Sequence, residues 1–436
     1  MASGEHSVAV IGGGWAGLAA AVTLAAAGRR VTVFEAAPAL GGRARRVRLN
    51  DAALDNGQHV LLGAYRQTLA LLGTVHGAGS EHELLERRCL HLEEPGVFRL
   101  RMPPLPAPWH VLAALLTMRG VPRQARLATI AFARRLQLAR FRCAAGMTVA
   151  ELLVGQPEEV VRHLWEPLCV ASLNTPFDRA SAQIFLNLVR AAFSEHARDS
   201  DLLLPRVDLS TLFPDAAAQY VSERGGEIRT GQSVAGLTAG ESAIVLSTTA
   251  AAAPYSACLI AVGPHQLDAL LSRLAAPQAA AARALVAAFA YEPICTVYLQ
   301  YPAALPVSQP MLKLDGKPGQ WLFDRGRLGG AQGLAAAVIS TDAVAAGMDH
   351  ESLARAIDAQ LRRMLPRLPA PVWSQAIAER RAGYACVPGL ERPAPGPLAP
   401  RVYLAGDYTD PEFPATLEAA TRSGVAAARL LLAART

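Results

Sequence analysis

The N-terminal residues contain the pattern that most restricts how this chain can fold. An apolar segment, Ser7–Ile11, runs into three glycines spaced Gly12-x-Gly14-x-x-Gly17, and an Ala/Leu-rich stretch follows. A second apolar segment, Arg30–Glu35, ends in an acid. Strand, glycine turn, helix and strand in this order predict a βαβ unit, because glycines permit the tight turn and the close helix packing. We therefore expect an α/β fold with a Rossmann-type dinucleotide site.

Each part of this unit has an expected role in binding. Gly14 lets the backbone approach a pyrophosphate, and the helix that begins at Trp15 and Ala16 directs free N–H groups and its positive end at it. Glu35 lies 18 residues after Gly17, where a carboxylate accepts hydrogen bonds from ribose hydroxyls. An acid at this position disfavours the 2′-phosphate of NADP.

Two further motifs indicate that the dinucleotide is FAD. The turn Leu40-Gly-Gly-Arg43 follows Glu35, as in flavoproteins where this turn runs along the pyrophosphate. Near the C-terminus a predicted strand ends in Gly406-Asp407 before a helix, so the aspartate can bind the ribityl chain and the helix can point its positive end at the flavin ring. The predicted cofactor-binding residues are Gly12, Gly14, Trp15, Ala16, Gly17, Glu35, Gly42, Arg43, Gly57, Gln58, His59, Val234, Gly406, Asp407, Thr416 and Leu417.

The two halves of the nucleotide-binding unit are separated in the sequence, which predicts discontinuous domains. We expect an FAD-binding domain from residues 1–65, 205–265 and 391–436, and a substrate-binding domain from 66–204 and 266–390. The cofactor should lie between them. No second G-x-G-x-x-G occurs, so a built-in NAD(P)H site is not expected, and an external electron donor that the sequence does not identify must reduce the flavin.

Cysteine spacing and hydropathy argue against two other classes of protein. The six cysteines form no C-x-x-C pair, so we expect free thiols and no metal site. Residues 7–28 carry no charge, but glycines interrupt them and no basic segment precedes them, so we expect neither a signal peptide nor a membrane span. A cytoplasmic protein without a nucleic-acid partner is expected.

One segment is strongly basic. Residues 95–150 contain no Asp or Glu and nine arginines, interleaved with apolar residues. The arginines are Arg99, Arg101, Arg119, Arg123, Arg126, Arg134, Arg135, Arg140 and Arg142. A basic, apolar-faced segment predicts peripheral docking on anionic lipid at the inner face of the cell membrane. The alternative is an ordinary arginine-rich helical pair packed on the core.

Longer segments give the chain a family resemblance. From residue 7 to its C-terminus it resembles the amine oxidase/phytoene desaturase superfamily of flavoproteins. Within that superfamily it is most similar to the hydroxysqualene dehydroxylases, the squalene-associated FAD-dependent enzymes of hopanoid biosynthesis. The segments that carry the likeness are 55–65 (DNGQHVLLGAY), 164–176 (LWEPLCVASLNTP), 205–210 (PRVDLS), 320–325 (QWLFDR), 405–409 (AGDYT) and 414–418 (PATLE).

The resemblance implies a fold and a reaction. The fold is a glutathione-reductase-like FAD domain with a mixed sheet-and-helix substrate domain. In the reaction, hydride from the N5 atom of reduced FAD replaces the hydroxyl group of hydroxysqualene or a related polyprenoid, which gives squalene. This chemistry requires a donor that helps water leave, and a dry cavity that prevents recapture of an allylic cation.

The subfamily segments contain five catalytic candidates: His59, Asp208, Glu166, Asn174 and Tyr408. The resemblance puts Gln58 and His59 near the flavin, where His59 is either the donor or a structural histidine. Tyr408 follows Asp407 and is expected near the ring.

The other candidates each have a structural alternative. Asp208 is either an acid with a raised pKa or, as we favour, the ion-pair partner of Arg206. Glu166 and Asn174 flank an apolar stretch and are expected to face the cavity, although Asn174 suits a helix cap equally well.

Three other functions remain open. Flavin amine oxidases commonly place a lysine near N5, and this chain has only Lys313 and Lys317. A carotenoid-type desaturase would share the fold and the class of substrate. A non-enzymatic prenyl-lipid chaperone is disfavoured, because such proteins have lost the dinucleotide site that is intact here.

Overall fold

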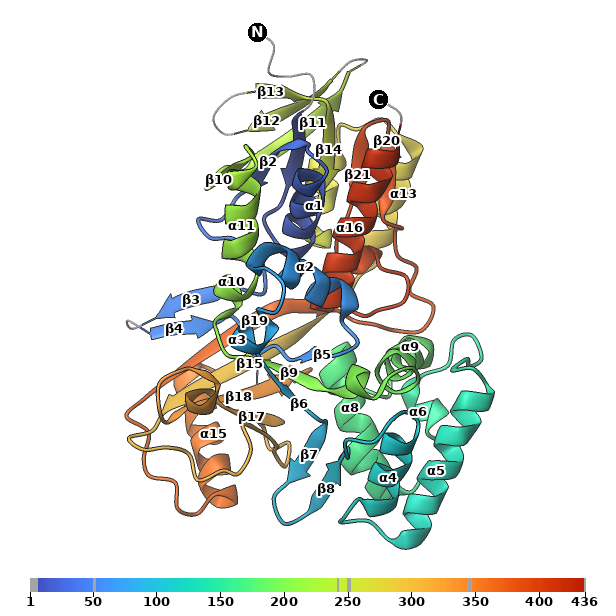
Figure 1. Ribbon diagram of the computed structural model, residues 1–436, viewed down its shortest axis with the longest axis vertical. Helices are drawn as coiled ribbons and strands as arrows, with labels where there is room; N and C mark the ends of the chain where they lie inside the picture. The colour runs from blue at the N-terminus through green and yellow to red at the C-terminus, as the bar shows by residue number, and fades with distance from the viewer. Residues whose placement is uncertain are drawn as a thin grey trace.

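A six-stranded sheet forms the centre of the upper half of the molecule in Figure 1, a computed structural model. The structure describes residues 7–49, 52–240, 243–248, 252–342, 345 and 347–434, so both ends of the predicted FAD-binding domain, 1–6 and 435–436, lie outside it. Neighbouring strands pair in parallel, except that β20 is antiparallel to β21. In order across the sheet, the strands are β10 (Glu227–Thr230), β2 (Arg30–Glu35), β1 (Ser7–Ile11), β14 (Ala257–Ile260), β21 (Val402–Leu404) and β20 (Gly396–Ala399).

Helix α1 (Trp15–Ala26) packs between α11 (Pro214–Glu223) and α16 (Leu417–Ala433). Its alanines and leucines are almost completely buried. The contact with α16 is close: a Cβ atom on Gly424 would lie 2.1 Å from the carbonyl oxygen of Ala16. A small antiparallel sheet completes this half, formed by β11 (Val234–Ala239), β12 (Ile244–Thr248) and β13 (Ala252–Tyr255).

A five-stranded antiparallel sheet lies below. Helix α15 (His350–Met364) covers one of its faces, where apolar side chains of β15 and β18 are buried. On the other face, register aligns Thr296, Val338, Trp321 and Lys313 in one row. In order, the strands are β16 (Met311–Lys313), β17 (Trp321–Asp324), β18 (Leu334–Ser340), β15 (Tyr291–Gln300) and β19 (Trp373–Tyr384).

The lower right of Figure 1 is helical. Its helices are α4 (Trp109–Thr117), α5 (Arg123–Leu138), α6 (Val149–Leu152), α7 (Glu158–Val160), the π-helix η1 (Val161–Trp165), α8 (Glu166–Leu173) and α9 (Ala182–Phe193). The hairpin of β7 (His91–Glu94) and β8 (Phe98–Arg101) lies between these helices and the five-stranded sheet. Smaller elements link the parts: β3 (Arg46–Leu49), β4 (Ala52–Asp55), β5 (Leu61–Leu62), α3 (Glu81–Leu84), β6 (Leu85–Arg88), 3₁₀-helix η2 (Ala197–Ser200), β9 (Leu202–Pro205) and η3 (Arg325–Leu328).

The predicted α/β fold is confirmed. Two helices from the predicted substrate-binding domain pack against the upper half instead. Helix α2 (Arg66–His76) packs against α16 and α11, because its buried Leu71 and Leu72 join the core of the upper half. Helix α13 (Pro277–Ala287), which follows α12 (Pro264–Leu271), packs against β20. The division into an FAD-binding and a substrate-binding domain stays a prediction, with these two helices belonging to the upper half by their contacts.

Candidate functional site

The glycine turn between β1 and α1 leaves open space at one of its three glycines. Gly12 has a positive φ of 108°, and a Cβ atom there would lie 2.5 Å from the carbonyl oxygen of Ala261. A Cβ atom on Gly17 would lie 1.9 Å from the carbonyl oxygen of Gly12. At Gly14 the nearest atom is the Cα of Gly42, 3.9 Å away. Gly12 and Gly17 thus permit packing, while Gly14 leaves room for a ligand against the backbone.

The N-terminus of α1 has amide groups available for an anion. Gly14 is the N-cap residue and has no side chain that could cap the helix, so the first N–H groups lack a side-chain partner. The Trp15 indole donates to the carbonyl oxygen of Ala44 at 3.0 Å, and Gly41 donates its N–H to the carbonyl oxygen of Gly13 at 2.8 Å. The second glycine turn is therefore held directly against the first.

Arg43 and Asp407, predicted from opposite ends of the sequence, meet in one ion pair. The guanidinium donates to Asp407 at 2.6 Å and to the carbonyl oxygen of Ala382 at 2.8 Å. The neighbouring Asp407 carboxylate raises the pKa of Arg43 further. Asp407 begins the short helix η4 (Asp407–Thr409) and is buried, whereas the Arg43 side chain is partly exposed.

Glu35 ends strand β2 beside the glycine turn. One of its carboxylate oxygens accepts from the N–H of Gly13 at 2.7 Å, and the other from the N–H of Ala37 at 2.8 Å. The N–H of Gln232 bonds to the Glu35 carbonyl at 2.9 Å, which brings Val234, the first residue of β11, to the same end of the sheet.

At the other end of the candidate site, Thr416 caps α16 by accepting from the N–H of Ala419 at 3.1 Å. Leu417 is the first helical residue. Glu418, also in this first turn, is buried and accepts from the N–H groups of Gln67 and Thr68 at 3.0 and 2.9 Å. Burial raises the pKa of Glu418. Its carboxylate thus caps α2 and is directed away from a ligand at the end of α16.

Gly57, Gln58 and His59 lie beside strand β15. Gly57 has a positive φ of 112°, and the nearest neighbours of a Cβ atom there would be His59 and Thr296, at 3.9 and 4.0 Å. Gln58 donates to the hydroxyl of Tyr298 at 2.7 Å. The hydroxyl of Thr296 is buried without a hydrogen-bond partner among the described residues.

The His59 ring is neutral at neutral pH. Burial lowers its pKa to about 4. Its Nδ1 lies 3.3 Å from the carbonyl oxygen of Gly57, a group that can only accept, so Nδ1 carries the proton and Nε2 presents a lone pair. In this arrangement the ring accepts a hydrogen bond through Nε2. The predicted donor role would require a flipped or protonated ring.

The predicted partner of Asp208 is wrong. Its carboxylate contacts Arg46 at 3.0 Å, not Arg206, because β3 lies alongside the start of α10 (Leu209–Leu212). Asp208 caps α10 and also accepts from the hydroxyl of Thr211 at 2.9 Å. Although burial opposes the shift, hydrogen bonds from Thr211 and Arg46 lower the pKa of Asp208. The direction of this shift is opposite to the raised pKa that the acid interpretation requires.

Tyr408 and Asn174 both have structural partners. Tyr408 is fully buried, donates to the carbonyl oxygen of Val262 at 3.2 Å, and has its pKa raised by burial. Asn174 ends α8 in the left-handed conformation, as expected of a helix cap. Its amide donates to the carbonyl oxygen of Glu292 at 3.2 Å, while its side-chain oxygen is buried and has no hydrogen-bond partner in the described part of the chain.

Glu166 lines a cavity of about 320 Å³ between η1, the hairpin and β16–β17. Lys313 and His163 both contact Glu94 there, His163 at 3.0 Å. Among the described residues, the Glu166 carboxyl has no hydrogen-bond or ion-pair partner, and burial raises its pKa against the opposing charge of Lys313. Three strand spacings, about 14 Å, separate Lys313 from Thr296 along the sheet. The cavity is therefore set apart from Gly57, and its charged lining differs from the dry cavity that the resemblance implies.

These features fit FAD. The open space at Gly14, the uncapped start of α1 and the Glu35 carboxylate suit a pyrophosphate and a ribose. The unpaired Thr296 hydroxyl beside Gly57 suits a polar ring edge. Thr296 and Glu418 were not among the predicted site residues. Alternation along β15 could have indicated a buried face, but nothing in the local sequence indicated that the Thr296 hydroxyl lacks a hydrogen-bond partner there.

Comparison with known proteins gives a family and a set of relatives. The family model for flavin-containing amine oxidoreductases matches residues 15–432. A hydroxysqualene dehydroxylase from Rhodopseudomonas palustris is 29% identical over 450 residues, covering 99% of both chains. One from Zymomonas mobilis is 27% identical and covers 97% of this chain and 98% of the relative. A hydroxyneurosporene desaturase from Rhodobacter capsulatus is 46% identical over 80 residues, 18% of this chain and 16% of the relative.

Solved structures have the same fold. An oxidoreductase from Methanosarcina mazei superposes with a TM-score of 0.73 at 16% identity, covering 96% of this chain and 99% of the other. Putrescine oxidase with bound putrescine superposes with a TM-score of 0.69 at 16% identity, covering 98% and 99%. At these identities the likeness establishes the architecture of the whole chain.

Proposed function

The chain belongs to the flavin-containing amine oxidoreductases, and on that premise we propose that it removes the hydroxyl group of hydroxysqualene reductively, with FAD as cofactor, to give squalene. The observation that carries the proposal is end-to-end similarity to hydroxysqualene dehydroxylases, which extends through both halves of the molecule. In the reaction the carbon–oxygen bond breaks, a carbon–hydrogen bond forms with two electrons, and one proton leaves with the oxygen as water.

The chain's own residues would bind and orient the reactants. Gly14 and the start of α1 would hold the pyrophosphate, Glu35 the ribose, and the Arg43–Asp407 pair the ribityl side. Reduced FAD supplies the hydride when bound. His59, with Nε2 unprotonated, would accept a hydrogen bond from the substrate hydroxyl and so orient it.

Glu166 is the proposed source of the proton. Of the five predicted catalytic residues, it combines a raised pKa with a carboxyl group free of partners among the described residues. Trp321 and Val338 lie between the cavity at Glu166 and Thr296 along the sheet. The proton would therefore travel through water, and Glu166 would act as a proton reservoir that does not touch the substrate.

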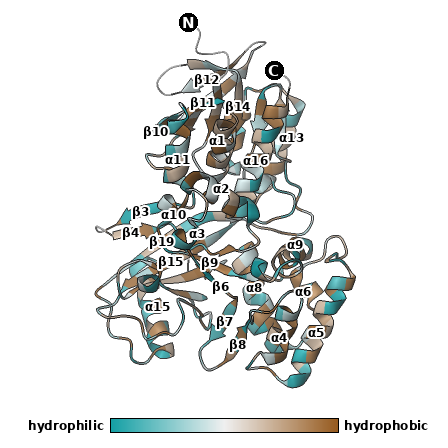
Figure 2. Cartoon of the chain, in the orientation of Figure 1, coloured by the Kyte–Doolittle hydropathy of each residue, from teal (hydrophilic) through white to brown (hydrophobic). Residues whose placement is uncertain are grey.

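Docking on an anionic membrane is part of the proposal. None of the nine arginines between residues 95 and 150 contacts a carboxylate among the described residues, whereas fifteen arginines elsewhere do. The segment also holds six of the ten exposed large apolar side chains: Val97, Leu105, Trp109, Leu116, Leu127 and Leu138. In Figure 2, hydrophobic and hydrophilic residues interleave along α5.

Unpaired cations beside exposed apolar side chains suit the surface of an anionic bilayer. Among the described residues, no helix is long and apolar enough to cross a membrane. Docking would also let a thirty-carbon substrate enter the protein without crossing water, which would cost on the order of 20 kcal/mol at ~0.8 kcal/mol per CH₂.

The first test is anaerobic. The FAD-loaded protein is reduced with dithionite and mixed with hydroxysqualene, and squalene is measured by mass spectrometry while flavin absorbance is followed. Squalene formed in step with flavin reoxidation supports the proposal, and oxidised protein serves as the control. Absence of squalene from fully loaded, reduced protein would contradict it.

A second candidate is a polyprenoid desaturase, favoured by the 80-residue similarity to hydroxyneurosporene desaturase. A desaturase oxidises its substrate and reduces the flavin, which is the reverse of the proposed dehydroxylation. Oxidised protein would then introduce a double bond into a polyprenoid chain, and reduced protein would leave hydroxysqualene unchanged.

A further inference from the structure

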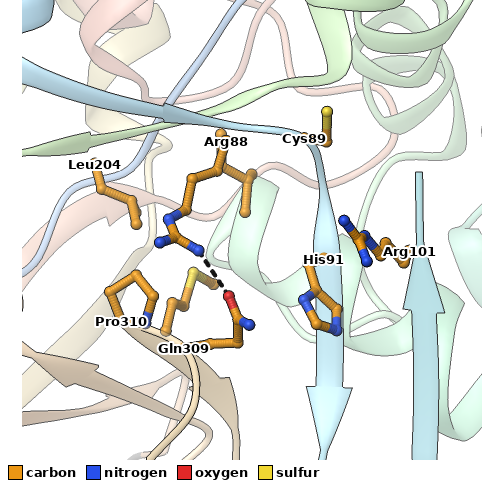
Figure 3. A pocket seen from close by; sticks show the side chains of 9 residues that line it. Arg88, Cys89, His91, Arg101, Leu204, Gln309 and Pro310 are labelled. Atoms are coloured by element: carbon orange, nitrogen blue, oxygen red, sulfur yellow. Dashed lines mark hydrogen bonds between the residues drawn. The ribbon is translucent and has the colours of Figure 1, made fainter. Parts of the chain in front are cut away.

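A second cavity, of about 260 Å³, lies between the β7–β8 hairpin, strand β9 and the loop that leads into β16 (Figure 3). One wall is basic and consists of Arg88, His91 and Arg101. An apolar wall consists mainly of Leu202, Leu204 and Pro310, and Figure 3 shows Leu204 and Pro310 on the same side as Arg88, across from His91 and Arg101. The cavity lies outside the candidate FAD site and shares no lining residue with the cavity at Glu166.

Hydrogen-bond donors in the basic wall remain available. Arg101 makes no ion pair or hydrogen bond through its side chain among the described residues. Paired with it across the hairpin, His91 has a buried Nε2 without a hydrogen-bond partner; the nearest carboxylate oxygen, on Glu93, is 3.4 Å away. Figure 3 shows the His91 and Arg101 side chains next to each other.

Arg88 closes the basic wall from β6. Its Nε donates to Glu86 at 2.5 Å, and one terminal nitrogen donates to the side-chain oxygen of Gln309 at 2.7 Å, as drawn in Figure 3. Among the described residues, the second terminal nitrogen of Arg88 and the amide nitrogen of Gln309 have no hydrogen-bond partner, so both are free to donate. Donors from three separate segments therefore surround one space.

The electrostatic field in this cavity favours an anion. Burial lowers the pKa of His91, and the charges of Arg101, Arg99 and Arg88 lower it further, although Glu93 acts in the opposite direction. With Glu86 engaged by Arg88, the charge of Arg101 is not neutralised by any carboxylate among the residues described.

We propose that this cavity binds a phosphate group carried on an apolar chain. A carboxylate is planar and is satisfied by one guanidinium fork, whereas a phosphate accepts from donors on several sides, as Arg88, His91, Arg101 and Gln309 provide. The apolar wall of Leu202, Leu204 and Pro310 would contact the chain that bears the phosphate. The inference is independent of the reaction proposed above.

The phosphate could belong to a membrane lipid or to a soluble ligand, and the experiment separates these sources. Calorimetric titrations use two probes: inorganic phosphate, and dihexanoyl phosphatidic acid below its micellar concentration. If the lipid binds at least tenfold more tightly than inorganic phosphate, the apolar wall contributes and a lipid is the source. If the two bind equally, the site serves a phosphate without a chain, and the apolar part of the proposal is overturned.

Arg101→Leu is the test variant and Arg99→Leu is its matched control. Arg99 lies two residues away on the same face of β8 and is also exposed. It has no carboxylate contact among the described residues, but it does not line the cavity. We expect Arg101→Leu to weaken binding of the lipid probe at least tenfold and Arg99→Leu less than twofold. Equal losses in the two variants, or no saturable binding of either probe to the unaltered protein, would overturn the proposal.

Cys89 gives an independent measure of occupancy. It lines the cavity and is exposed, whereas Cys143 is partly buried and the other four cysteines are buried. The bound probe should slow alkylation of Cys89, measured by mass spectrometry, in the unaltered protein and in Arg99→Leu but not in Arg101→Leu. Unchanged alkylation of Cys89 at saturating probe would show that binding occurs elsewhere and would also overturn the proposal.

Discussion

The upper half of the molecule, which holds the candidate FAD site, and the basic segment 95–150 use arginine in opposite ways. In the upper half, Arg43 contacts Asp407 and Arg46 contacts Asp208, each joining residues more than 160 positions apart in the sequence. In the basic segment, none of the nine arginines has a carboxylate partner among the residues described, and exposed apolar side chains lie among them. Paired arginines hold the structure together, whereas unpaired ones leave charge available to a partner.

Among the variants that test this comparison, we expect the largest loss of stability and of FAD binding from a substitution in the upper half. Gly17→Ala would place a methyl group 1.9 Å from the carbonyl oxygen of Gly12, so α1 must shift and we expect about 3 kcal/mol of lost stability with no FAD retained. Gly14→Ala is the control, because its methyl group meets only Gly42, at 3.9 Å. It should fold normally and bind FAD weakly. Thermal melts and flavin absorbance measure both, and a stable, yellow Gly17→Ala protein would contradict the assignment.

Charge reversal in the basic segment should have the next largest effect. The double variant Arg134→Glu and Arg135→Glu should weaken binding to phosphatidylglycerol vesicles a hundredfold or more. Removing one positive charge near the membrane costs roughly 1 kcal/mol of binding free energy, and replacing it with a negative charge costs roughly 1 kcal/mol more. The matched control reverses Arg355 and Arg362 in α15, which contact Glu351 and Asp358. Sedimentation with vesicles measures the difference. Equal losses would mean that net charge alone drives binding.

Asp407→Asn should have a smaller effect. It removes the charge that Arg43 contacts, and loss of a charged hydrogen bond costs about 2 kcal/mol. The cost is smaller here because the Arg43 side chain is 39% exposed, so solvent screens the ion pair. We expect FAD affinity to fall about tenfold while the fold is retained. Fluorescence titration of apoprotein with FAD measures this change. Unchanged affinity would remove Asp407 from the proposed site.

The smallest expected effect is a pH dependence of stability. The His59 pKa of about 4 lies below its ordinary value of 6.5, so the unfolded chain binds more protons between these values and the folded protein loses stability as pH falls from 6.5 toward 4. Asp55, whose pKa burial raises to about 6, acts in the opposite direction. Comparing His59→Gln with the unaltered protein isolates the histidine. The variant should lose less stability in this window, and parallel curves in denaturant titrations would contradict the prediction.

Local patterns predicted the α/β fold, the βαβ unit and the FAD cofactor because each depends on backbone geometry within a few residues. Gly12, Gly14 and Gly17 act through the turn that they form themselves, and the structure has that turn with its strand and helix. Helices α10 and α11 are separated at Phe213, because Pro214 cannot donate a backbone hydrogen bond to the preceding turn.

Only the tertiary structure decided which charged groups meet. Asp208 contacts Arg46 instead of its sequence neighbour Arg206, and Arg43 contacts Asp407, because strand order and helix packing bring distant segments together. The same holds for the cavity at Arg88, His91 and Arg101, whose three donors come from strands β6, β7 and β8 while the leucines of its apolar wall come from β9. A sequence motif carries its own geometry over a few residues, whereas a contact between distant side chains depends on how the whole chain packs.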